Sequence, residues 1–354
     1  MIYREAGQFK TSYRADQAVF PILQDRVAIA LILLAAFAGV PLFASDYLLV
    51  AILIPFLILS MAAIGLNILV GYCGQISLGT GGFMAVGAYA AYNLALRVPE
   101  LNLLVVFLLA GGFAALVGIL FGIPSLRIKG FYLAVATLAA QFFLDWLFSR
   151  VGWFTNYTPS GSVAAPPIRI LGYDFSAPAD RYLLCLILVL LAAIFAKNLV
   201  RGRIGRSWMA IRDMDIAAEI IGIRPMIAKL SAFAVSSYLI GVSGALWAFL
   251  HLGAWEPLAF DINRSFNLLF MIIIGGLGSI LGCFLGAAFI TMLPIALNQI
   301  PAALGMPIST ATASHLEFMI FGALIVFFLI AEPHGLARLW AVGKQKLRLW
   351  PFPH

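Results

Sequence analysis

The sequence carries few charged residues. Only 10% of its 354 residues are Asp, Glu, Lys or Arg, whereas 63% are hydrophobic and the mean hydropathy is +1.03. Soluble domains carry about 25% charged residues, so this shortage excludes a soluble globular protein and predicts an integral membrane protein. The net charge of +7 does not indicate nucleic-acid binding, because the basic residues cluster at the ends of apolar runs.

Cysteine and histidine are scarce and scattered. Cys73, Cys185 and Cys283 stand far apart inside apolar stretches, which is typical of small buried residues and not of disulfides or metal ligands. The four histidines show no ligand spacing, and the sequence contains no phosphate-binding P-loop and no Gly-x-Ser-x-Gly elbow. We therefore expect no metal, no cofactor and no enzymatic activity.

Apolar runs long enough to cross about 30 Å of hydrocarbon are abundant. Ten are predicted, near residues 27–43, 47–70, 83–98, 101–123, 131–148, 182–200, 230–250, 266–281, 283–300 and 316–331. With the N-terminus inside, 17 of the 22 Lys and Arg residues are cytoplasmic and five are outside, as the positive-inside rule expects. The sequence predicts an all-α polytopic membrane protein of about ten transmembrane helices, with both termini cytoplasmic.

This topology divides the chain into three parts. Residues 1–26 are expected to form a cytoplasmic arm without a cleavable signal, residues 27–331 a transmembrane domain, and residues 332–354 a basic cytoplasmic tail. A long outer loop at 149–181 is rich in turn formers and aromatic residues. It either meets an external partner or caps a pathway, or its aromatic residues simply anchor the fifth span at the membrane interface.

The longest charged segment lies between two spans, at residues 201–229. We predict a short helix in it, with Ser207 as N-cap and Gly222 at the left-handed position that ends the helix, and Pro225 prevents its resumption. Such a helix cannot cross a bilayer. It is either a docking surface for a cytoplasmic partner or a solvated loop whose positive charge helps to fix the topology.

A polar, glycine-rich interruption, GYCGQISLGTGGF, occupies residues 71–83. Irregular backbone at membrane depth is tolerated only inside protein or along a cavity, and broken helices are where transporters place substrate sites. Gln75, Ser77 and Thr80, together with Gln141 from the fifth span, are therefore candidates for lining a translocation path. The alternatives are a plain cytoplasmic turn for the segment and an interhelical hydrogen bond for Gln141.

Two further features concern the spans themselves. Gly278, Gly282 and Gly286 are four residues apart, which predicts a ridge of small residues where two helices pack closely. Ionisable residues are nearly missing from the spans, and Asp145 and Glu317 stand near the outer ends of theirs. Because buried charges normally mark proton relays and ion sites, their scarcity argues against a proton- or sodium-driven carrier.

Several motifs follow one another along nearly the whole chain: NILVGYCGQISLG (67–79) with GAY (87–89), PSLRIKGFY (124–132), GRSWMAIRD with IAAEIIG (205–222), GGLGS (275–279) and PHG (333–335). In this order they resemble the LivM-like permease subunits of branched-chain amino acid ABC importers. The resemblance implies that the 201–229 segment holds a coupling helix seated in a groove of a cytoplasmic ATPase subunit. It assigns this coupling role to Arg206, Ile211, Arg212, Asp213, Asp215, Ala217, Ala218, Glu219 and Gly222.

The resemblance also implies a second, LivH-like permease subunit, a periplasmic binding protein and a place in the bacterial inner membrane. Two positions depart from the family pattern: Ile216 stands where importers have Glu, and residues 158–162 read TPSGS in place of a TGGS-like run. The second departure leaves urea, amides and aromatic acids open as solutes beside branched-chain amino acids. The expected function is the permease subunit of an ATP-driven importer; the alternative is a stand-alone carrier or channel.

Overall fold

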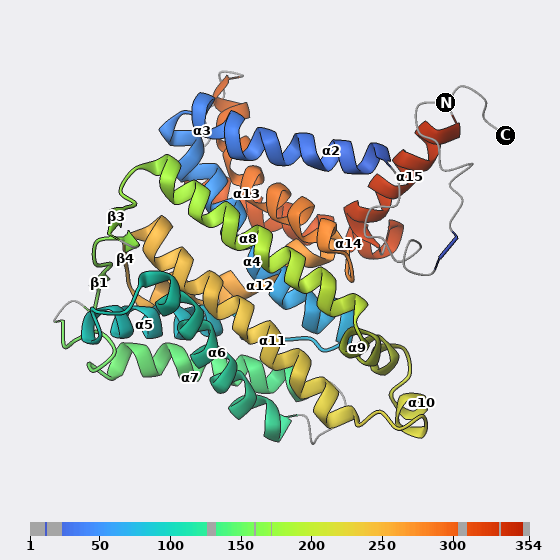
Figure 1. Cartoon of the computed structure of the whole chain (residues 1–354), viewed down its shortest axis with the longest axis horizontal. Helices are drawn as coiled ribbons and strands as arrows, with labels where there is room; N and C mark the ends of the chain where they lie inside the picture. The colour runs from blue at the N-terminus through green and yellow to red at the C-terminus, as the bar shows by residue number, and fades with distance from the viewer. Residues whose placement is uncertain are drawn as a thin grey trace.

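The computed structural model describes residues 11–12, 23–125, 132–158, 161–170, 172–303, 310–332 and 334–349. Within these ranges long helices cross the molecule, short strands lie at one end, and the helices labelled α9 and α10 lie at the opposite end (Figure 1). Eight of the described helical stretches are long and apolar enough to cross a membrane. The prediction of an all-α polytopic membrane protein is confirmed.

The first half of the chain forms α2 (Leu23–Leu34), η1 (Ala35–Gly39), α3 (Val40–Phe43), η2 (Leu48–Leu53), α4 (Ile54–Asn67), η3 (Ile68–Tyr72), α5 (Thr80–Arg97), α6 (Leu103–Ser125), α7 (Tyr132–Arg150), β1 (Val163–Ala164), β2 (Arg169–Ile170) and β3 (Tyr173–Asp174). The second half forms α8 (Pro178–Arg201), α9 (Arg203–Asp213), α10 (Asp215–Ile220), α11 (Pro225–Leu246), η4 (Trp247–Leu252), β4 (Ala254–Trp255), η5 (Pro257–Phe260), α12 (Ile262–Gly275), α13 (Ile280–Ala303), α14 (Thr310–Ala331) and α15 (Gly335–Leu349).

Each predicted apolar run overlaps a helix or a series of joined helices. The third and tenth runs, α5 and α14, are not among the eight stretches that meet the length and hydropathy criteria for a span. The count of ten spans and the cytoplasmic placement of both termini therefore stay predictions. Most of the predicted 1–26 arm lies outside the described residues, and the predicted basic tail contains the helix α15.

The predicted long outer loop, 149–181, contains three of the strands. β1 pairs antiparallel with β4, so that Val163 faces Trp255, and β2 pairs with β3. The first of these small sheets joins the loop after α7 to the loop after α11. Two connections that are far apart in the sequence are thereby held together at one end of the helices (Figure 1).

Helix α11 lies at the centre of the packing, against α4, α5 and α6. Its contacts are close because small residues meet there: Gly241 faces Gly87 of α5, and Gly244 faces Met84. In a bilayer, burial of apolar surface does not drive helices together, so close backbone approach through small residues supplies much of the packing energy. This contact positions the irregular segment that precedes α5.

One predicted boundary is wrong, and so is the predicted position of Gly278 on a helix. The run predicted at 266–281 ends at Gly275, where α12 stops, and a turn precedes α13. Gly278 therefore lies in this turn, with φ of 74°, and not on a helical ridge. Gly282 and Gly286 do lie on α13, where they face the backbone of Gly275 and Met271. The glycines permit the chain to turn between α12 and α13, whereas the continuous hydropathy of the segment predicts no turn there.

Candidate functional site

The charged segment 201–229 forms two helices and not the single predicted one. Helix α9 ends at Asp213, the extended backbone of Met214 breaks the path, and α10 begins at Asp215. Ser207 is not an N-cap, because it lies inside α9 and its hydroxyl donates to the carbonyl oxygen of Arg203 at 3.0 Å. The predicted N-cap is thus wrong by five residues, because Gly202 precedes α9, and the segment has an additional corner at Met214.

The end of the segment agrees with the prediction. Gly222 has φ of 91°, and the amide of the next residue, Ile223, donates to the carbonyl oxygen of Ala218 at 3.0 Å. This is the hydrogen-bond pattern that closes a helix with a left-handed residue. Nothing lies within 4 Å of the position that a Cβ at Gly222 would occupy. Its requirement for glycine is therefore conformational and not steric.

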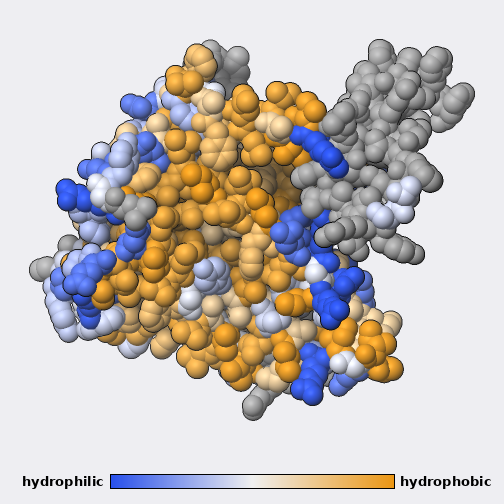
Figure 2. Space-filling model, in the orientation of Figure 1, coloured by the Kyte–Doolittle hydropathy of each residue, from blue (hydrophilic) through white to orange (hydrophobic). Residues whose placement is uncertain are grey.

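Helix α10 presents an exposed apolar surface at the end of the molecule. Four side chains, which we call the α10 patch, are between 65% and 81% exposed: Met214, Ile216, Ile220 and Ile221. Figure 2 shows this hydrophobic surface beside strongly hydrophilic residues, at the end of the molecule where α10 lies. An apolar patch rimmed by charge, on a helix too short to cross a bilayer, is typical of a protein interaction site.

The predicted coupling residues divide by exposure. Six are exposed beside the α10 patch: Arg206, Arg212, Asp213, Ala217, Glu219 and Gly222. Ile211 and Ala218 are buried, at 4% and 2% exposure, so both side chains hold the two helices in place instead of offering a surface. Asp215 is partly buried and pairs with Lys229 of α11 at 3.8 Å. The predicted coupling residues do not include those of the α10 patch. Four apolar side chains inside a charged segment could have indicated an exposed apolar surface there.

Helix α9 is fastened to the transmembrane helices by two polar contacts. The Trp208 indole is fully buried and donates to the Ser231 hydroxyl of α11 at 2.9 Å. The Arg212 guanidinium donates to the carbonyl oxygen of Gly71 at 2.8 Å, across 141 residues of sequence. Gly71 is the next-to-last residue of η3, in the last turn, where the carbonyls of a helix run out of amide partners. Arg212 therefore supplies a donor at the beginning of the irregular segment.

A second network holds the turn between α12 and α13 against the same point. Asn67 is buried, its side-chain oxygen accepts from the Gly278 amide at 2.9 Å, and its side-chain nitrogen donates to the Ser279 carbonyl at 3.0 Å. Gly71 packs directly on Gly278. Arg212 and Asn67 thus connect three elements: α9, the end of η3 and the α12–α13 turn.

The irregular segment 74–79 leads into α5, whose first amides need partners. The Gly82 amide donates to the side-chain oxygen of Gln141 at 2.5 Å, and the Gly81 amide donates to the Ser265 hydroxyl at 2.7 Å. The Leu78 amide donates to the Thr137 hydroxyl at 2.9 Å. Side chains of α7 and α12 therefore satisfy backbone groups that neither water nor lipid can reach.

Gln141 is the centre of this arrangement. Besides accepting from Gly82, its oxygen accepts from the Ser265 hydroxyl at 3.1 Å, and its nitrogen donates to the Phe260 carbonyl at 2.9 Å and to Asp145 at 3.2 Å. The side chain has no exposed surface. These contacts are the interhelical hydrogen bonds that the sequence offered as the alternative to a path-lining role.

The other predicted path residues are also enclosed. Gln75, Ser77 and Thr80 are at most 9% exposed, and the side-chain oxygens of Gln75 and Thr80 have no hydrogen-bond partner among the described residues. In this conformation the segment is not a plain turn in solvent. The passage of a solute along these side chains stays a prediction. Gln75 and Thr80, whose side-chain oxygens have no described partner, follow Gly71, the residue that Arg212 contacts, in the sequence.

Membrane-crossing helices, an enclosed helix break and an exposed apolar patch at one end together define a multi-pass membrane protein. The family model described as "Branched-chain amino acid transport system / permease component" matches residues 48–329. The chain belongs to this family.

The chain is similar to curated proteins from bacteria and an archaeon. It is 30% identical to the high-affinity branched-chain amino acid transport system permease protein LivM of Escherichia coli, over 77% of this chain and 66% of the relative. It is 22% identical to the probable branched-chain amino acid transport permease protein LivM of Methanocaldococcus jannaschii, over 66% of this chain and 68% of the relative.

A third relative carries a broader name. It is the probable ABC transporter permease protein y4mJ of Sinorhizobium fredii, 27% identical over 53% of this chain and 58% of the relative. The chain spans about two thirds of the length of the Escherichia coli and Methanocaldococcus jannaschii relatives. No solved structure matches it.

Proposed function

We propose that this chain is the transmembrane permease subunit of an ATP-binding-cassette importer in a bacterial inner membrane. Its solute is a branched-chain amino acid or a related small polar molecule. Its partners are cytoplasmic ATPase subunits, a second, LivH-like permease and a periplasmic binding protein. The family match and the names of the relatives support the class of solute.

The observation that carries the proposal is the connection from the α10 patch to the helix break. The patch offers apolar surface to a cytoplasmic subunit, and Arg212 at the end of α9 contacts the Gly71 carbonyl where the helix breaks. A displacement of α9 and α10 by an ATPase would therefore act directly on η3. Because Asn67 holds the α12–α13 turn on the same residues, α12 would move with it.

In this mechanism the protein alternates between two rigid arrangements, and ATP binding and hydrolysis select between them. The Trp208–Ser231 and Arg212–Gly71 hydrogen bonds join α9 to α11 and η3. Because packed helices move as units, these contacts would transmit a motion of α9 to the transmembrane helices. The segment 74–79 lies between α4–η3 and α5 and has few helical hydrogen bonds to break. It is the place where the path would open and close.

The proposal is tested by purifying the tagged chain from its host membrane in mild detergent and identifying the proteins bound to it by mass spectrometry. We expect P-loop ATPases and a second, different permease. Recovery of ATPases without a second permease would contradict the heteromeric pairing. Recovery of the chain alone, together with ATP-independent transport in liposomes, would contradict the importer and favour a carrier.

A further inference from the structure

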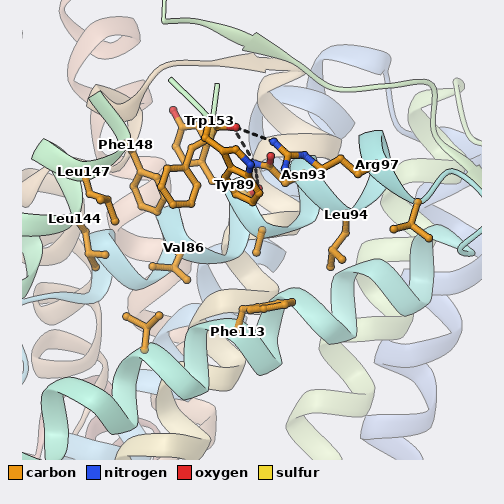
Figure 3. Close-up of a pocket in the computed structure, with 14 residues that line it drawn as sticks. Val86, Tyr89, Asn93, Leu94, Arg97, Phe113, Leu144, Leu147, Phe148 and Trp153 are labelled. Atoms are coloured by element: carbon orange, nitrogen blue, oxygen red, sulfur yellow. Dashed lines mark hydrogen bonds between the residues drawn. The ribbon is translucent and has the colours of Figure 1, made fainter. Parts of the chain in front are cut away.

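An apolar cavity lies between α5, α6 and α7, away from α9 and α10. Its volume is about 420 Å³, within the range of small-molecule pockets, and most of its lining side chains are aliphatic or aromatic. Figure 3 shows Val86 and Tyr89 of α5, Phe113 of α6 and Leu144 and Leu147 of α7 around this space. The ring pair of Phe121 and Phe143, with centroids 6.0 Å apart, joins α6 to α7.

The rim of the cavity is positively charged. Arg97, the last residue of α5, stacks its guanidinium 3.6 Å from the centroid of the Trp153 ring and donates to the Trp153 carbonyl at 3.0 Å. Arg97 ends α5 and Trp153 lies in the turn that follows α7, at the membrane–water boundary that Arg and Trp favour. The guanidinium is exposed there and retains donors for an anion.

Asn93 lies one helical turn before Arg97 on α5, and only part of its side chain is hydrogen-bonded. Its side-chain nitrogen donates to the carbonyls of Tyr89 and Phe154, at 2.9 Å and 3.0 Å. Asn93 lines the cavity and is only 6% exposed, but its side-chain oxygen is itself enclosed and has no hydrogen-bond partner among the described residues. A buried acceptor is costly unless a donor reaches it. The apolar lining and Arg97 at the rim therefore fit a ligand with an apolar chain and an anionic group.

The outward face of α6 indicates where this ligand comes from. Its small residues point inward: Gly111 and Gly118 pack on Val242 and Ser237 of α11. Its outward side chains are bulky and apolar, namely Val105, Leu108, Leu109, Phe113, Leu116 and Leu120. Helix–helix interfaces in membranes are rich in small residues, so this bulky face is suited to lipid.

We propose that the cavity holds one anionic phospholipid, such as phosphatidylglycerol, of the leaflet at this end, the outer leaflet in the predicted topology. An acyl chain fills the space between α6 and α7, and the phosphate binds Arg97. Such a lipid would fix the relative position of α6 and α7, and so of Gln141, which caps α5. The proposal is independent of which solute the protein carries.

Native mass spectrometry tests it on the chain purified with its partner subunits and exposed to mixed micelles of phosphatidylglycerol or phosphatidylcholine. We expect one retained phosphatidylglycerol per chain and little phosphatidylcholine. Arg97→Gln should lower retention on the order of tenfold, as expected for the loss of a charge-assisted hydrogen bond. Arg150→Gln, which changes a cation at the end of α7 outside the cavity, should leave it unchanged.

A second pair of variants tests the acyl site. Ala90 lines the cavity, so Ala90→Phe should fill it and abolish retention, whereas Ala115→Phe on α6 lies outside the lining and should not. Equal retention by Arg97→Gln, Arg150→Gln and the unaltered chain would overturn the proposal, since boundary lipid alone would then explain the signal. Release of the lipid by excess leucine would also overturn it and make the cavity a solute site.

Discussion

Individual side chains in this protein satisfy backbone groups that a broken helix leaves without partners. Gln141 and Ser265 serve the amides at the start of α5, and Arg212 serves the carbonyl of Gly71 at the end of η3. In water each such group would be solvated at little cost. Within a membrane each must be met by protein, and this requirement gives single residues large effects on stability.

Substitution of Gln141 by Leu should destabilise the fold. The Gly82 amide and the Phe260 carbonyl would each lose a buried partner, at about 1–3 kcal/mol per group. We expect a lower thermal unfolding temperature in detergent, measured by loss of monodispersity on size-exclusion chromatography. Gln75→Leu is the matched control, because its side-chain oxygen has no described partner. An unchanged unfolding temperature for Gln141→Leu would contradict the capping role.

Gly87 offers a prediction of the opposite kind, in which an added atom is harmful. A Cβ at Gly87 would overlap the carbonyl oxygen of Gly241, whereas nothing lies within 4 Å of one at Gly112. Overpacking of this kind costs about 1–3 kcal/mol. Gly87→Ala should therefore lower the unfolding temperature and Gly112→Ala should not. Equal effects of the two substitutions would show that α5 and α11 are farther apart than described.

At the scale of elements, the sequence predicts some features and hides others. Hydropathy placed the helices, and the glycines and polar residues of 71–83 predicted the break before α5. The corner at Met214 was hidden, because nothing in RDMDIAAE forbids a continuous helix. Hydropathy did not show the turn at Gly276 and Gly278, since the apolar run continues through it, although the GGLGS motif resembles a turn of the family. The burial of Ala218 and the contact of Arg212 with Gly71 depend on tertiary packing across many residues of sequence.

Helix α10 should dock the ATPase through its patch and not through its buried alanine. Ile220→Asp places a charge on a side chain that is 81% exposed, so the chain should still fold. Loss of one central apolar contact should weaken ATPase capture on the order of tenfold or more. Leu258→Asp, on an exposed apolar side chain of η5, is the control for capture. Full capture by Ile220→Asp would place the docking surface elsewhere.

At the scale of the whole molecule, two ends of different character are joined by helices packed through glycine. One end carries the paired strands β1 and β4, and the other carries α9 and α10 (Figure 1). Contacts at Gly71 and Gly278 join the second end to the helix break. The fold therefore contains a continuous physical connection from the α10 patch to the middle of the protein, which coupling between distant sites requires.

Substitution of Arg212 by Lys should interrupt this connection without removing the charge. Lysine is a flexible point charge and does not reproduce the planar donor set that reaches the Gly71 carbonyl. We expect ATPase capture to persist while solute uptake per ATP hydrolysed falls, measured in proteoliposomes. Arg206→Lys, on an exposed residue of α9, should leave that ratio unchanged. Loss of capture by Arg212→Lys would instead make the residue part of the docking surface.

The three cysteines have a practical consequence. Cys73, Cys185 and Cys283 are free and buried, at 2% exposure or less. Burial also raises the pKa of the Cys73 thiol to about 12, against an opposing effect of Lys229, so little thiolate forms at neutral pH. The cysteines of the unaltered chain should therefore not react with maleimide dyes or nitroxide spin labels. Spin labels attached to cysteines introduced at Ala217 and Leu258 would give the distribution of distances between α10 and the opposite end of the protein. A change in this distribution when ATP binds would measure the movement of α10.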